Sequence, residues 1–568
     1  MQPFEATCVV ARAAVWEGIT PLSMSLRRLM LSAFGLVPAL LLASCGGSLP
    51  SSAVPRPLAE RYAGALTDTT ALTTVIRDRD IKRPDLTSNV APLEQLRAEL
   101  AKSDPSGAYA GITYDLTYGN RMPKDWIVAT PDVWGRKASE WDKAQSDALV
   151  KQVHDLVASA QRRVDIALLQ PVPASRFLDA LRSALETAAR QGRTIDVRIV
   201  VGQYPPDYVD VASFFKALTE GLDTRRVRVS VAAYRSCIVF EDCASYSWNH
   251  AKIIAVDNRE ALVGGHNLWS DDYLDDDPVA DLSIRVQGPA AASAVRYLDR
   301  IWQYVCEHLD RKTSMAMMST TGNCPGPTAL PKIAGRGGVP MLAVGRLGSG
   351  ITKDFANQSD LARDLMMAAA LKDIRIVQQD VGFSLGRADP LFPESTIERL
   401  VDFLRRQDGD IYIVLSNIGA KGRSGMPYYN DVTPMQLAKR LRDEVRRRIE
   451  RNDPLSRWEI RKGPDPVNAM LCDRVHIAPF RFGPDEKWAD GSPIANHAKF
   501  WMVDGRTFYV GSDNMYPVNL QEFGYIVDDK KAAAEIKAAY WDKVWEWSSR
   551  AAFSGRGVEK CIFREILK

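Results

Sequence analysis

The sequence contains two copies of one motif whose residue types could act on a phosphate group. One copy is built around His250 and the other around His497, and both fit the pattern N-H-A-K-x4-D-x6-G-[GS]-x-N. The other shared polar positions are Lys252, Asp257 and Asn267 in the first copy and Lys499, Asp504 and Asn514 in the second. The chain has 6 histidines, and two of them hold the same place in this long pattern. Chance is a poor explanation, so we expect the two copies to act together.

The spacing explains how each copy could present its reactive groups. Residues two apart on a strand point to the same side, so His250 would lie beside Lys252, and His497 beside Lys499. Lysine ammonium groups and asparagine amides suit the non-bridging oxygens of a phosphodiester. A neutral imidazole can attack phosphorus, and a second, protonated imidazole can protonate the departing alcohol. The pattern predicts a phosphodiesterase centre with two histidines and with no metal or other cofactor.

Asp257 and Asp504 complete the candidate catalytic set. A bare carboxylate would repel a phosphate group, so we expect both to brace the motif through hydrogen bonds. Each precedes a turn-like dipeptide, Asn258-Arg259 or Gly505-Arg506. The strand after the turn would bring Asn267 or Asn514 back to the same edge as a candidate substrate-binding residue.

The segments around the two motifs follow the same order of predicted elements. In the first half, strands are predicted at 163–169, 194–201, 226–232, 252–256, 261–264 and 282–286, with helices at 174–191, 211–222 and 289–305. In the second half, strands are predicted at 373–378, 410–415, 474–478, 499–503, 507–510 and 524–527, with helices at 394–406, 434–449 and 530–549. This repetition predicts an α/β fold of two homologous lobes, each a mixed sheet flanked by helices. We expect a pseudo-two-fold axis with both motifs at one interface.

The expected domain boundaries follow from these elements and from composition. We expect an uncertain upstream segment at 1–23, a signal peptide at 24–45, a tether at 46–90, an N-terminal lobe at 91–311, an inter-lobe connection at 312–350 and a C-terminal lobe at 351–568. The connection is rich in Gly, Pro, Ser and Thr. Translation could naturally start at Met24 rather than at Met1.

Composition limits the class of protein. The 568 residues are 46% hydrophobic and 25% charged, which is typical of a soluble globular chain and not of a disordered or polytopic membrane protein. Lys and Arg number 73 against 70 Asp and Glu, a formal net charge of +3. We therefore expect no nucleic-acid partner, because binding to a polyanion favours a strongly basic surface.

The N-terminal region predicts export from a bacterial cytoplasm. Arg27 and Arg28 precede an apolar run at 29–42, which is typical of a signal peptide and too short and interrupted for a membrane span. The stretch Leu42-Ala43-Ser44-Cys45 resembles a bacterial lipobox. This predicts lipidation of Cys45 and a lipoprotein held on the membrane surface, periplasmic or at the cell surface. Ordinary signal cleavage nearby, giving a secreted protein, is the alternative.

The cysteines predict disulfides in an oxidising compartment. Setting aside Cys8 and Cys45 leaves six cysteines. Nearest-neighbour pairing would join 237 with 243, 306 with 324 and 472 with 561, although about 15 pairings are open to six cysteines. A zinc site fits less well, because no CxxC occurs.

The two motifs and their surroundings resemble the phospholipase D superfamily, above all the secreted actinobacterial phospholipases D. The resemblance covers residues 93–547 and includes the following segments: Thr130-Pro131 with Trp134-Gly135, Trp248, Gly264-Gly265, Trp269-Ser270-Asp271-Asp272-Tyr273, Gln378-Gln379-Asp380, Trp488-Ala489-Asp490-Gly491, Asn514-Met515-Tyr516-Pro517 and Leu520-Gln521-Glu522-Phe523-Gly524. Gly-Gly-His-Asn at 264–267 departs from the family's Gly-Gly-Ile-Asn.

The resemblance implies roles that the residues alone leave open. It implies the phospholipase D fold, with His250 as the nucleophile and His497 as the acid/base. It also implies that Asp281 and Glu522 are the acidic partners that orient the imidazoles. Glu522 replaces an aspartate of the relatives and is longer by one methylene group.

Aromatic residues near the motifs are candidates for head-group binding. Trp248 and Tyr429 are the two that we select, because an aromatic ring can hold a choline ammonium by a cation–π contact. Packing in the core is the alternative for such rings.

The expected function is that of a phospholipase D that cleaves the distal phosphodiester of phosphatidylcholine or phosphatidylethanolamine. The products would be phosphatidic acid and a head-group alcohol, with transfer to other alcohols as a side activity. The alternatives are a nuclease, a phosphatidyltransferase of the cardiolipin-synthase type and a non-catalytic binding protein. We expect a phospholipid substrate, a monomer and no metal, and no loop resembling an EF-hand occurs.

Overall fold

The structure is a computed structural model that describes residues 82–88, 91–203, 209–237, 247–310, 315–327, 329, 331–352, 357–384, 389–451 and 465–566. The chain divides into two units, Met1–Pro57 and Leu58–Lys568, and every described residue belongs to the second. The predicted signal peptide, Cys8 and Cys45 therefore lie outside the described residues, as does nearly all of the tether.

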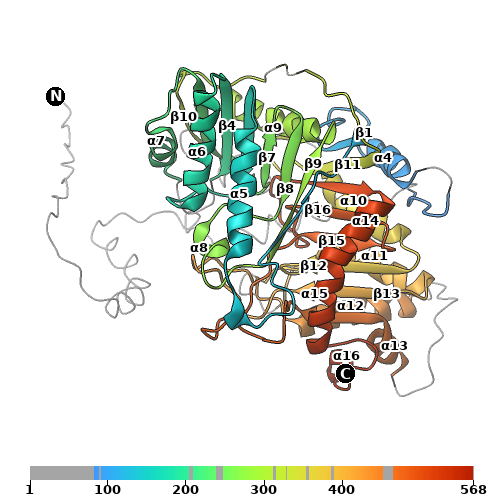
Figure 1. The fold of residues 1–568 in the computed structure, drawn as a ribbon. Coiled ribbons are helices and arrows are strands. Elements are labelled where there is room, and N and C mark those ends of the chain that lie inside the picture. The colour runs from blue at the N-terminus through green and yellow to red at the C-terminus, as the bar shows by residue number, and fades with distance from the viewer. Residues whose placement is uncertain are drawn as a thin grey trace, which may run out of the picture. The chain divides into compact units, whose positions relative to one another are not determined.

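The first sheet carries the strands of the first motif (Figure 1). Its order is β10-β5-β4-β3-β7-β8-β9-β2. The strands are β2 (Ile127–Thr130), β3 (Arg163–Leu168), β4 (Ile195–Gly202), β5 (Val227–Cys237), β7 (Ile253–Val256), β8 (Glu260–Gly264), β9 (Asp281–Gln287) and β10 (Met315–Ser319). Strands β3, β4 and β5 are parallel, whereas β7, β8 and β9 are antiparallel neighbours. A short β6 (Ser247–Trp248) pairs with β5.

The second sheet repeats this arrangement around the second motif. Its order is β1-β11-β17-β16-β15-β12-β13-β14. The strands are β1 (Tyr114–Asn120), β11 (Val339–Arg346), β12 (Asp373–Gln378), β13 (Asp410–Leu415), β14 (Val475–Pro479), β15 (Phe500–Val503), β16 (Thr507–Gly511) and β17 (Glu522–Asp528). The order β14-β13-β12-β15-β16-β17 matches β5-β4-β3-β7-β8-β9 of the first sheet. The predicted fold class, two mixed sheets flanked by helices, is confirmed.

The helices pack against the two sheets, and some of them lie within the core that the sheets share. They are α4 (Pro92–Lys102), α5 (Ala144–Ala158), α6 (Arg176–Arg190), α7 (Val211–Thr219), α8 (Ser270–Tyr273), α9 (Ala290–Glu307), α10 (Gln358–Ala369), α11 (Glu394–Arg406), α12 (Pro434–Glu450), α13 (Pro466–Arg474), α14 (Lys530–Ile536), α15 (Asp542–Ser548) and α16 (Ile562–Glu565). Local chemistry explains the ends of several of them. Helix α12, for example, begins with a capping box in which Thr433 and Gln436 satisfy each other's backbone N–H groups.

The strands outside the repeats cross the expected lobe boundaries. Strand β1 lies within 91–311 but pairs with β11 in the second sheet, and the expected connection at 312–350 supplies β10 to the first sheet and β11 to the second. Strand β11 follows a Gly-rich stretch, yet its own residues are mostly buried. Its apolar side chains gain more by completing a sheet than by remaining a linker.

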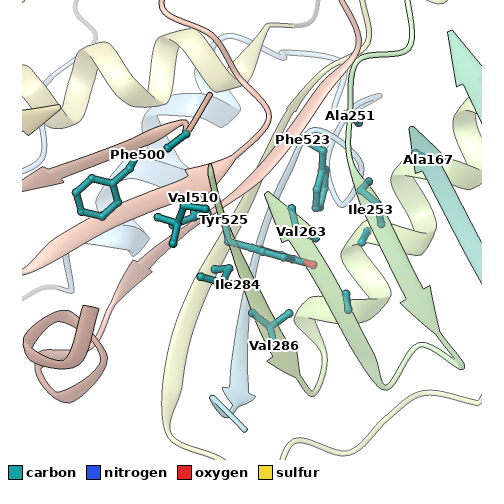
Figure 2. Close-up of a cluster of buried hydrophobic side chains, with 14 of the residues drawn as sticks. Ala167, Ala251, Ile253, Val263, Ile284, Val286, Phe500, Val510, Phe523 and Tyr525 are labelled. Atoms are coloured by element: carbon teal, nitrogen blue, oxygen red, sulfur yellow. The ribbon is translucent and has the colours of Figure 1, made fainter. Parts of the chain in front are cut away.

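The two sheets share one hydrophobic core (Figure 2). Ile253, Val263 and Ile284 from the first sheet lie in the same cluster as Val510 and other residues of the second, namely Phe500, Phe523 and Tyr525. All of these side chains are almost fully buried. At about 1.5–3 kcal/mol for each large side chain, this core holds the motif-bearing strands of both sheets in a fixed relation.

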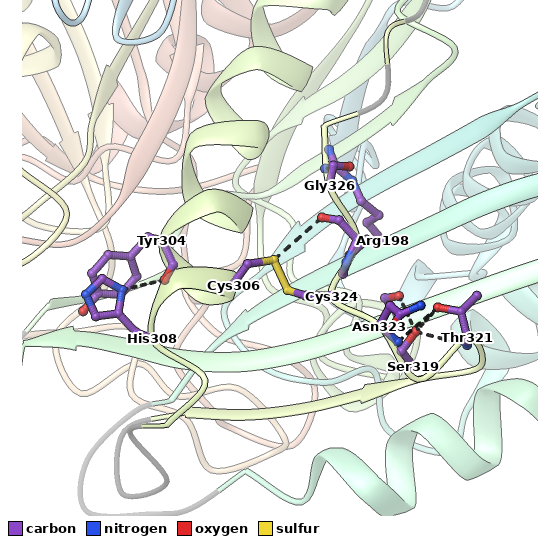
Figure 3. The surroundings of a disulfide bond; sticks show 11 residues. Arg198, Tyr304, Cys306, His308, Ser319, Thr321, Asn323, Cys324 and Gly326 are labelled. Carbon is purple, nitrogen blue, oxygen red and sulfur yellow. Dashed lines mark hydrogen bonds between the residues drawn. A yellow bond between two sulfur atoms is a disulfide. The ribbon is translucent and has the colours of Figure 1, made fainter.

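In the part of the chain that the structure describes, two disulfides fasten helices to neighbouring segments. Cys306 of α9 is bonded to Cys324 after β10 (Figure 3), and Cys472 of α13 is bonded to Cys561 before α16. Both pairs were predicted and are confirmed, whereas Cys243 of the third predicted pair lies outside the described residues. Among the helices that the structure describes, none is long and apolar enough to cross a membrane.

Candidate active site

The two motif histidines lie side by side between the sheets. The ring centroids of His250 and His497 are 6.4 Å apart, with 77° between the ring planes. Backbone hydrogen bonds between the two halves of the chain hold the histidines in this position. The His250 N–H donates to the Gln521 carbonyl (3.0 Å), and the His497 N–H donates to the Ala280 carbonyl (2.7 Å). The prediction that both motifs meet at one interface is confirmed.

Each histidine is held by a carboxylate from the other half of the chain. His250 Nδ1 lies 2.9 Å and 3.0 Å from the two oxygens of Glu522, and His497 Nδ1 lies 2.9 Å from Asp281 Oδ2. The two histidine side chains are 7% and 5% exposed. A carboxylate at Nδ1 selects the tautomer with the proton on Nδ1, which leaves Nε2 of each ring for chemistry. Asp281 and Glu522 thus lie beside the imidazoles, as the resemblance implied. The pairing is crossed, because each histidine is paired with the carboxylate from the other half of the chain.

The [GS] position of each motif lies against the acidic residue of the same half of the chain. A Cβ atom at Gly265 would lie 1.9 Å from Asp281 Oδ1, so no larger residue fits there without displacing that carboxylate. The equivalent position in the second motif is Ser512, whose hydroxyl donates to Glu522 Oε2 at 2.5 Å. The variable [GS] position of the motif therefore faces the acidic partner in both halves.

Lys252 and Lys499 place two ammonium groups beside the histidines. Lys252 Nζ donates to the His250 carbonyl at 2.6 Å, and Lys499 donates to the His497 carbonyl. Burial lowers the pKa of Lys252 to about 7 and that of Lys499 well below its usual value, although nearby carboxylates oppose both changes. A phosphodiester anion in contact with them would raise both pKa values again, so the pair is suited to holding a negatively charged group.

The electrostatic surroundings of the two imidazoles differ. Burial lowers the pKa of both, and the ammonium charges of Lys252 and Lys499 lower it further. At His497 the charge of Asp281 opposes this effect. Burial alone would raise the pKa of Asp281, but His497, His266 and Lys499 hold it below its usual range, whereas burial raises the pKa of Glu522 to about 7. The His497 pair is therefore better able to carry an imidazolium ion.

Asp257 and Asp504 lie at the far ends of the motif strands from the histidines. The Asp257 carboxylate accepts N–H groups of residues 161–163 at 2.7–2.9 Å, and Asp504 accepts N–H groups of residues 371–373 at 2.7–3.1 Å. Both have a positive φ, 54° and 56°, in a left-handed turn. Bracing through hydrogen bonds is what the structure shows, so neither belongs with the residues that contact the reacting group.

The motif asparagines are buried near the histidines and partly unsatisfied. Asn514 Nδ2 donates to the Tyr516 hydroxyl at 2.6 Å. The Oδ1 atoms of Asn267 and Asn514 have no hydrogen-bond partner within the described part of the chain. These oxygens are acceptors, so contact with the oxygens of a phosphate group falls to the Nδ2 N–H groups.

The aromatic candidates occupy different surroundings. Trp248 is buried in a small cluster with Leu169, Trp269 and Leu520, so packing accounts for much of its surface. Tyr429 is half-buried, and burial raises its pKa to about 12. Its neighbour Tyr428 is the ring that contacts His497, with centroids 5.0 Å apart.

The contacts of Tyr273, Ser512 and Arg346 with the catalytic pairs were not predicted from the sequence. The Tyr273 hydroxyl donates to Asp281 at 2.8 Å and lies 3.3 Å from His497 Nδ1. Ser512 and Arg346 lie against Glu522. Only the [GS] variation in the motif could have pointed to Ser512. His266 is hydrogen-bonded to Thr130 and Ser283, which gives it a structural role.

The site offers groups for phosphoryl transfer from this chain alone. Two buried imidazoles with free Nε2 atoms and two ammonium groups converge within one space. Across the described ranges, no group of three or more His, Cys, Asp or Glu side chains is arranged to hold a metal ion.

Comparisons with known proteins give one extensive match in sequence. The chain is 30% identical over 513 residues to the phospholipase D of Streptomyces antibioticus, a match that covers 81% of this chain and 88% of that protein. No protein-family model matches. Among solved structures, similarity is found to the phosphatidylserine synthase of Haemophilus influenzae Rd KW20 (TM-score 0.48, 12% identity, 83% of this chain and 93% of that one). A polyphosphate kinase of Porphyromonas gingivalis is also similar (TM-score 0.36, 11% identity, 73% and 46%).

Proposed function

The chain belongs to the phospholipase D family and is a phosphodiester hydrolase, and we propose that it hydrolyses the distal phosphodiester of phosphatidylcholine or phosphatidylethanolamine. The products are phosphatidic acid and the head-group alcohol. An alcohol that replaces water in the second step gives transphosphatidylation. The observation that carries the proposal is the crossed pair of histidine–carboxylate contacts, because it prepares two imidazoles for unlike tasks at one phosphate.

In the proposed mechanism His250 is the nucleophile. Its Nε2 attacks phosphorus, the bond to the head-group oxygen breaks, and His497 gives its proton to that oxygen. The neutral His497 then takes a proton from water, whose oxygen attacks the phosphohistidine and releases His250. The lysines and the amides of Asn267 and Asn514 stabilise the charge on the phosphoryl oxygens.

The unlike carboxylates support this division of roles. A nucleophile must be neutral, and His250 is surrounded by the cations Lys252, Lys499 and Arg346, which disfavour its protonation. A general acid must be able to hold a proton, and Asp281 favours a proton on His497. The asymmetry agrees with the roles that the family resemblance implies.

The first test is capture of the covalent intermediate. In wild-type enzyme quenched shortly after mixing with labelled phospholipid, we expect acid-labile label on His250. The His497→Asn variant should accumulate this adduct with a p-nitrophenyl phosphodiester, whose leaving group needs no proton. His250→Asn should form no adduct with either substrate. Label on His497 would reverse the roles, and no adduct together with full inhibition by EDTA would point to a metal-activated water.

The second test separates the substrate classes. Purified protein is incubated in EDTA with phosphatidylcholine, phosphatidylethanolamine, phosphatidylglycerol and plasmid DNA in parallel. We expect phosphatidic acid from at least one lipid and intact DNA. Cleavage of DNA without lipid hydrolysis would make the protein a nuclease, and cardiolipin formation from phosphatidylglycerol would make it a phosphatidyltransferase.

The remaining parts of the proposal concern where the enzyme works. We propose a monomer exported from a bacterial cytoplasm and held at a membrane surface through a lipid on Cys45. Such an anchor would keep the enzyme close to phospholipid and would leave nucleic acid outside its normal contacts.

A further inference from the structure

One buried arginine approaches the carboxylate of only one of the two histidine pairs. Arg346 ends β11 and lies directly opposite Glu522 in the antiparallel ladder between β11 and β17. Its Nη2 is 3.7 Å from Glu522 Oε1. The side chain is 2% exposed and is fixed by the Leu520 carbonyl (2.9 Å), Asp360 (3.0 Å) and Asp513 (2.7 Å).

Among the described residues, no arginine forms an ion pair with Asp281. Asp281 is held instead by the backbone N–H of Leu282 (2.8 Å) and by the Tyr273 hydroxyl (2.8 Å). A buried carboxylate that lacks a nearby cation tends to take up a proton, and a protonated Glu522 would lose the negative charge that strengthens its hydrogen bond with the Nδ1–H of His250. The state of Glu522 therefore depends on the charges around it.

Those charges come from several elements. The cations near Glu522 and His250 are Arg346 from β11 and the motif residues Lys252 and Lys499. The other titratable groups near Glu522 are Asp513 and Tyr509 from the β16 region and Tyr297 from α9. Arg346 and the lysines favour the carboxylate, whereas Asp513 opposes it. Lys252 and Lys499 also bind the substrate phosphate in the proposed mechanism. Arg346 is therefore the cation that stays beside Glu522 throughout a reaction cycle.

We propose that Arg346 is a positioning residue that acts through Glu522 on His250: it keeps the carboxylate ionised and oriented, so that the nucleophilic imidazole holds its proton on Nδ1. The inference rests on the proposed function in assigning the nucleophile to His250. Arg346 itself contacts neither substrate nor the imidazole in this scheme.

Arg363 provides a matched control. It is also buried, at 4% exposure, and it contacts the same two carboxylates, Asp513 (3.2 Å) and Asp360 (2.8 Å). Among the ion pairs of the described residues, Arg363 has none with Glu522. Replacing either arginine removes one guanidinium from the same buried cluster, and only Arg346 touches the catalytic carboxylate.

The test compares Arg346→Gln with Arg363→Gln. Both variants are expected to melt at a lower temperature than the wild type. In Arg346→Gln, the acidic limb of kcat/KM for a p-nitrophenyl phosphodiester should move to higher pH by about one unit or more, because a cation within about 4 Å stabilises a carboxylate by that much. In Arg363→Gln the limb should stay at the wild-type pH. Equal shifts in both variants, or a loss of rate in Arg346→Gln without a shift, would overturn the proposal.

A second readout does not depend on activity. In protein labelled with 15N-histidine, the His250 ring signal is identified by its loss in His250→Asn, and its titration should change in Arg346→Gln but not in Arg363→Gln. If Arg346→Gln does not fold, Arg346→Lys replaces it, alone and with Glu522→Gln. The lysine change should alter the His250 titration only while Glu522 is present, and an equal change in both backgrounds would refute action through Glu522. Failure of the proposed function would instead appear as wild-type enzyme that is inactive on phosphodiesters, while the NMR comparison would still decide the role of Arg346.

Discussion

At the scale of single residues, the centre combines nearly identical motifs with unlike supports. Glu522, the partner of His250, also contacts a serine hydroxyl and an arginine, whereas Asp281, the partner of His497, contacts a tyrosine hydroxyl. The extra methylene of Glu522 accompanies Ser512 where the first motif has Gly265. The two imidazoles therefore differ in proton affinity through their neighbours rather than through their own spacing.

The ionisation of Glu522 predicts an acidic limb in the pH dependence of the reaction. Burial raises the pKa of Glu522 to about 7, and the ionised form, present above that pH, is the stronger acceptor for the Nδ1–H of His250. We expect kcat/KM to fall as the pH drops through about 7. Glu522→Gln should lower kcat/KM by roughly 10²- to 10⁴-fold, as for loss of an orienting carboxylate, and should remove this limb. A limb that persists unchanged in Glu522→Gln would assign it to another group.

At the scale of secondary-structure elements, turns and strand ends position the aspartates that hold the histidines and the motif strands. Strands β8 and β9 lie so close that Gly265 touches Asp281, and the left-handed turns after β7 and β15 turn Asp257 and Asp504 onto backbone amides. These are features of turns and strand ends.

Replacing Gly265 tests this close approach. In Gly265→Ala the new methyl group would overlap Asp281 Oδ1, so the carboxylate has to move away from His497. We expect kcat to fall by about 10²-fold, the effect of a misplaced catalytic group, with a smaller change in KM. Gly338→Ala is the control, because nothing lies within 4 Å of its Cβ position and its φ is not in the left-handed region. Full activity in Gly265→Ala would show that Asp281 can reach His497 by another route.

Replacing Asp257 or Asp504 separates bracing from catalysis. Asp257→Ala and Asp504→Ala each leave backbone N–H groups unpaired, so we expect the free energy of unfolding to fall by about 1–3 kcal/mol in urea titrations. At temperatures well below melting, kcat per folded molecule should stay close to that of the wild type. Asp281→Asn should show the opposite pattern, with little loss of stability and a large loss of kcat. A large loss of kcat in a stable Asp257→Ala would return this residue to the catalytic set.

At the scale of the whole molecule, each half of the chain completes the site of the other. The acidic partner of His250 is 272 residues away in sequence, and that of His497 is 216 residues away. The shared core between the sheets and the backbone contacts at Gln521 and Ala280 hold these pairs in register. Neither sheet alone contains a histidine with its carboxylate.

The proposed membrane anchor is a prediction about the molecule outside the described residues. Cys45→Ala should move the protein from the membrane fraction to the soluble fraction, because stable attachment needs more than one acyl chain and a lipobox product would supply them. Catalytic constants with a soluble phosphodiester should not change. Fractionation is checked by immunoblotting and the mature N-terminus by mass spectrometry. Unchanged fractionation, with an N-terminus elsewhere, would refute the anchor.

The sequence by itself determined what depends on neighbours along the chain. Alternating apolar residues predicted the strands around both motifs and the helices between them, and the repeated N-H-A-K pattern identified the histidines and lysines, because such patterns follow from the geometry of single elements. The tertiary structure decided what depends on pairing between distant segments. Strand β1 joined the sheet of the other half, Asp281 crossed to His497, and Arg346 came to lie opposite Glu522. Which edges pair, and in which register, is set by burial of surfaces from remote parts of the chain, and no local pattern records it.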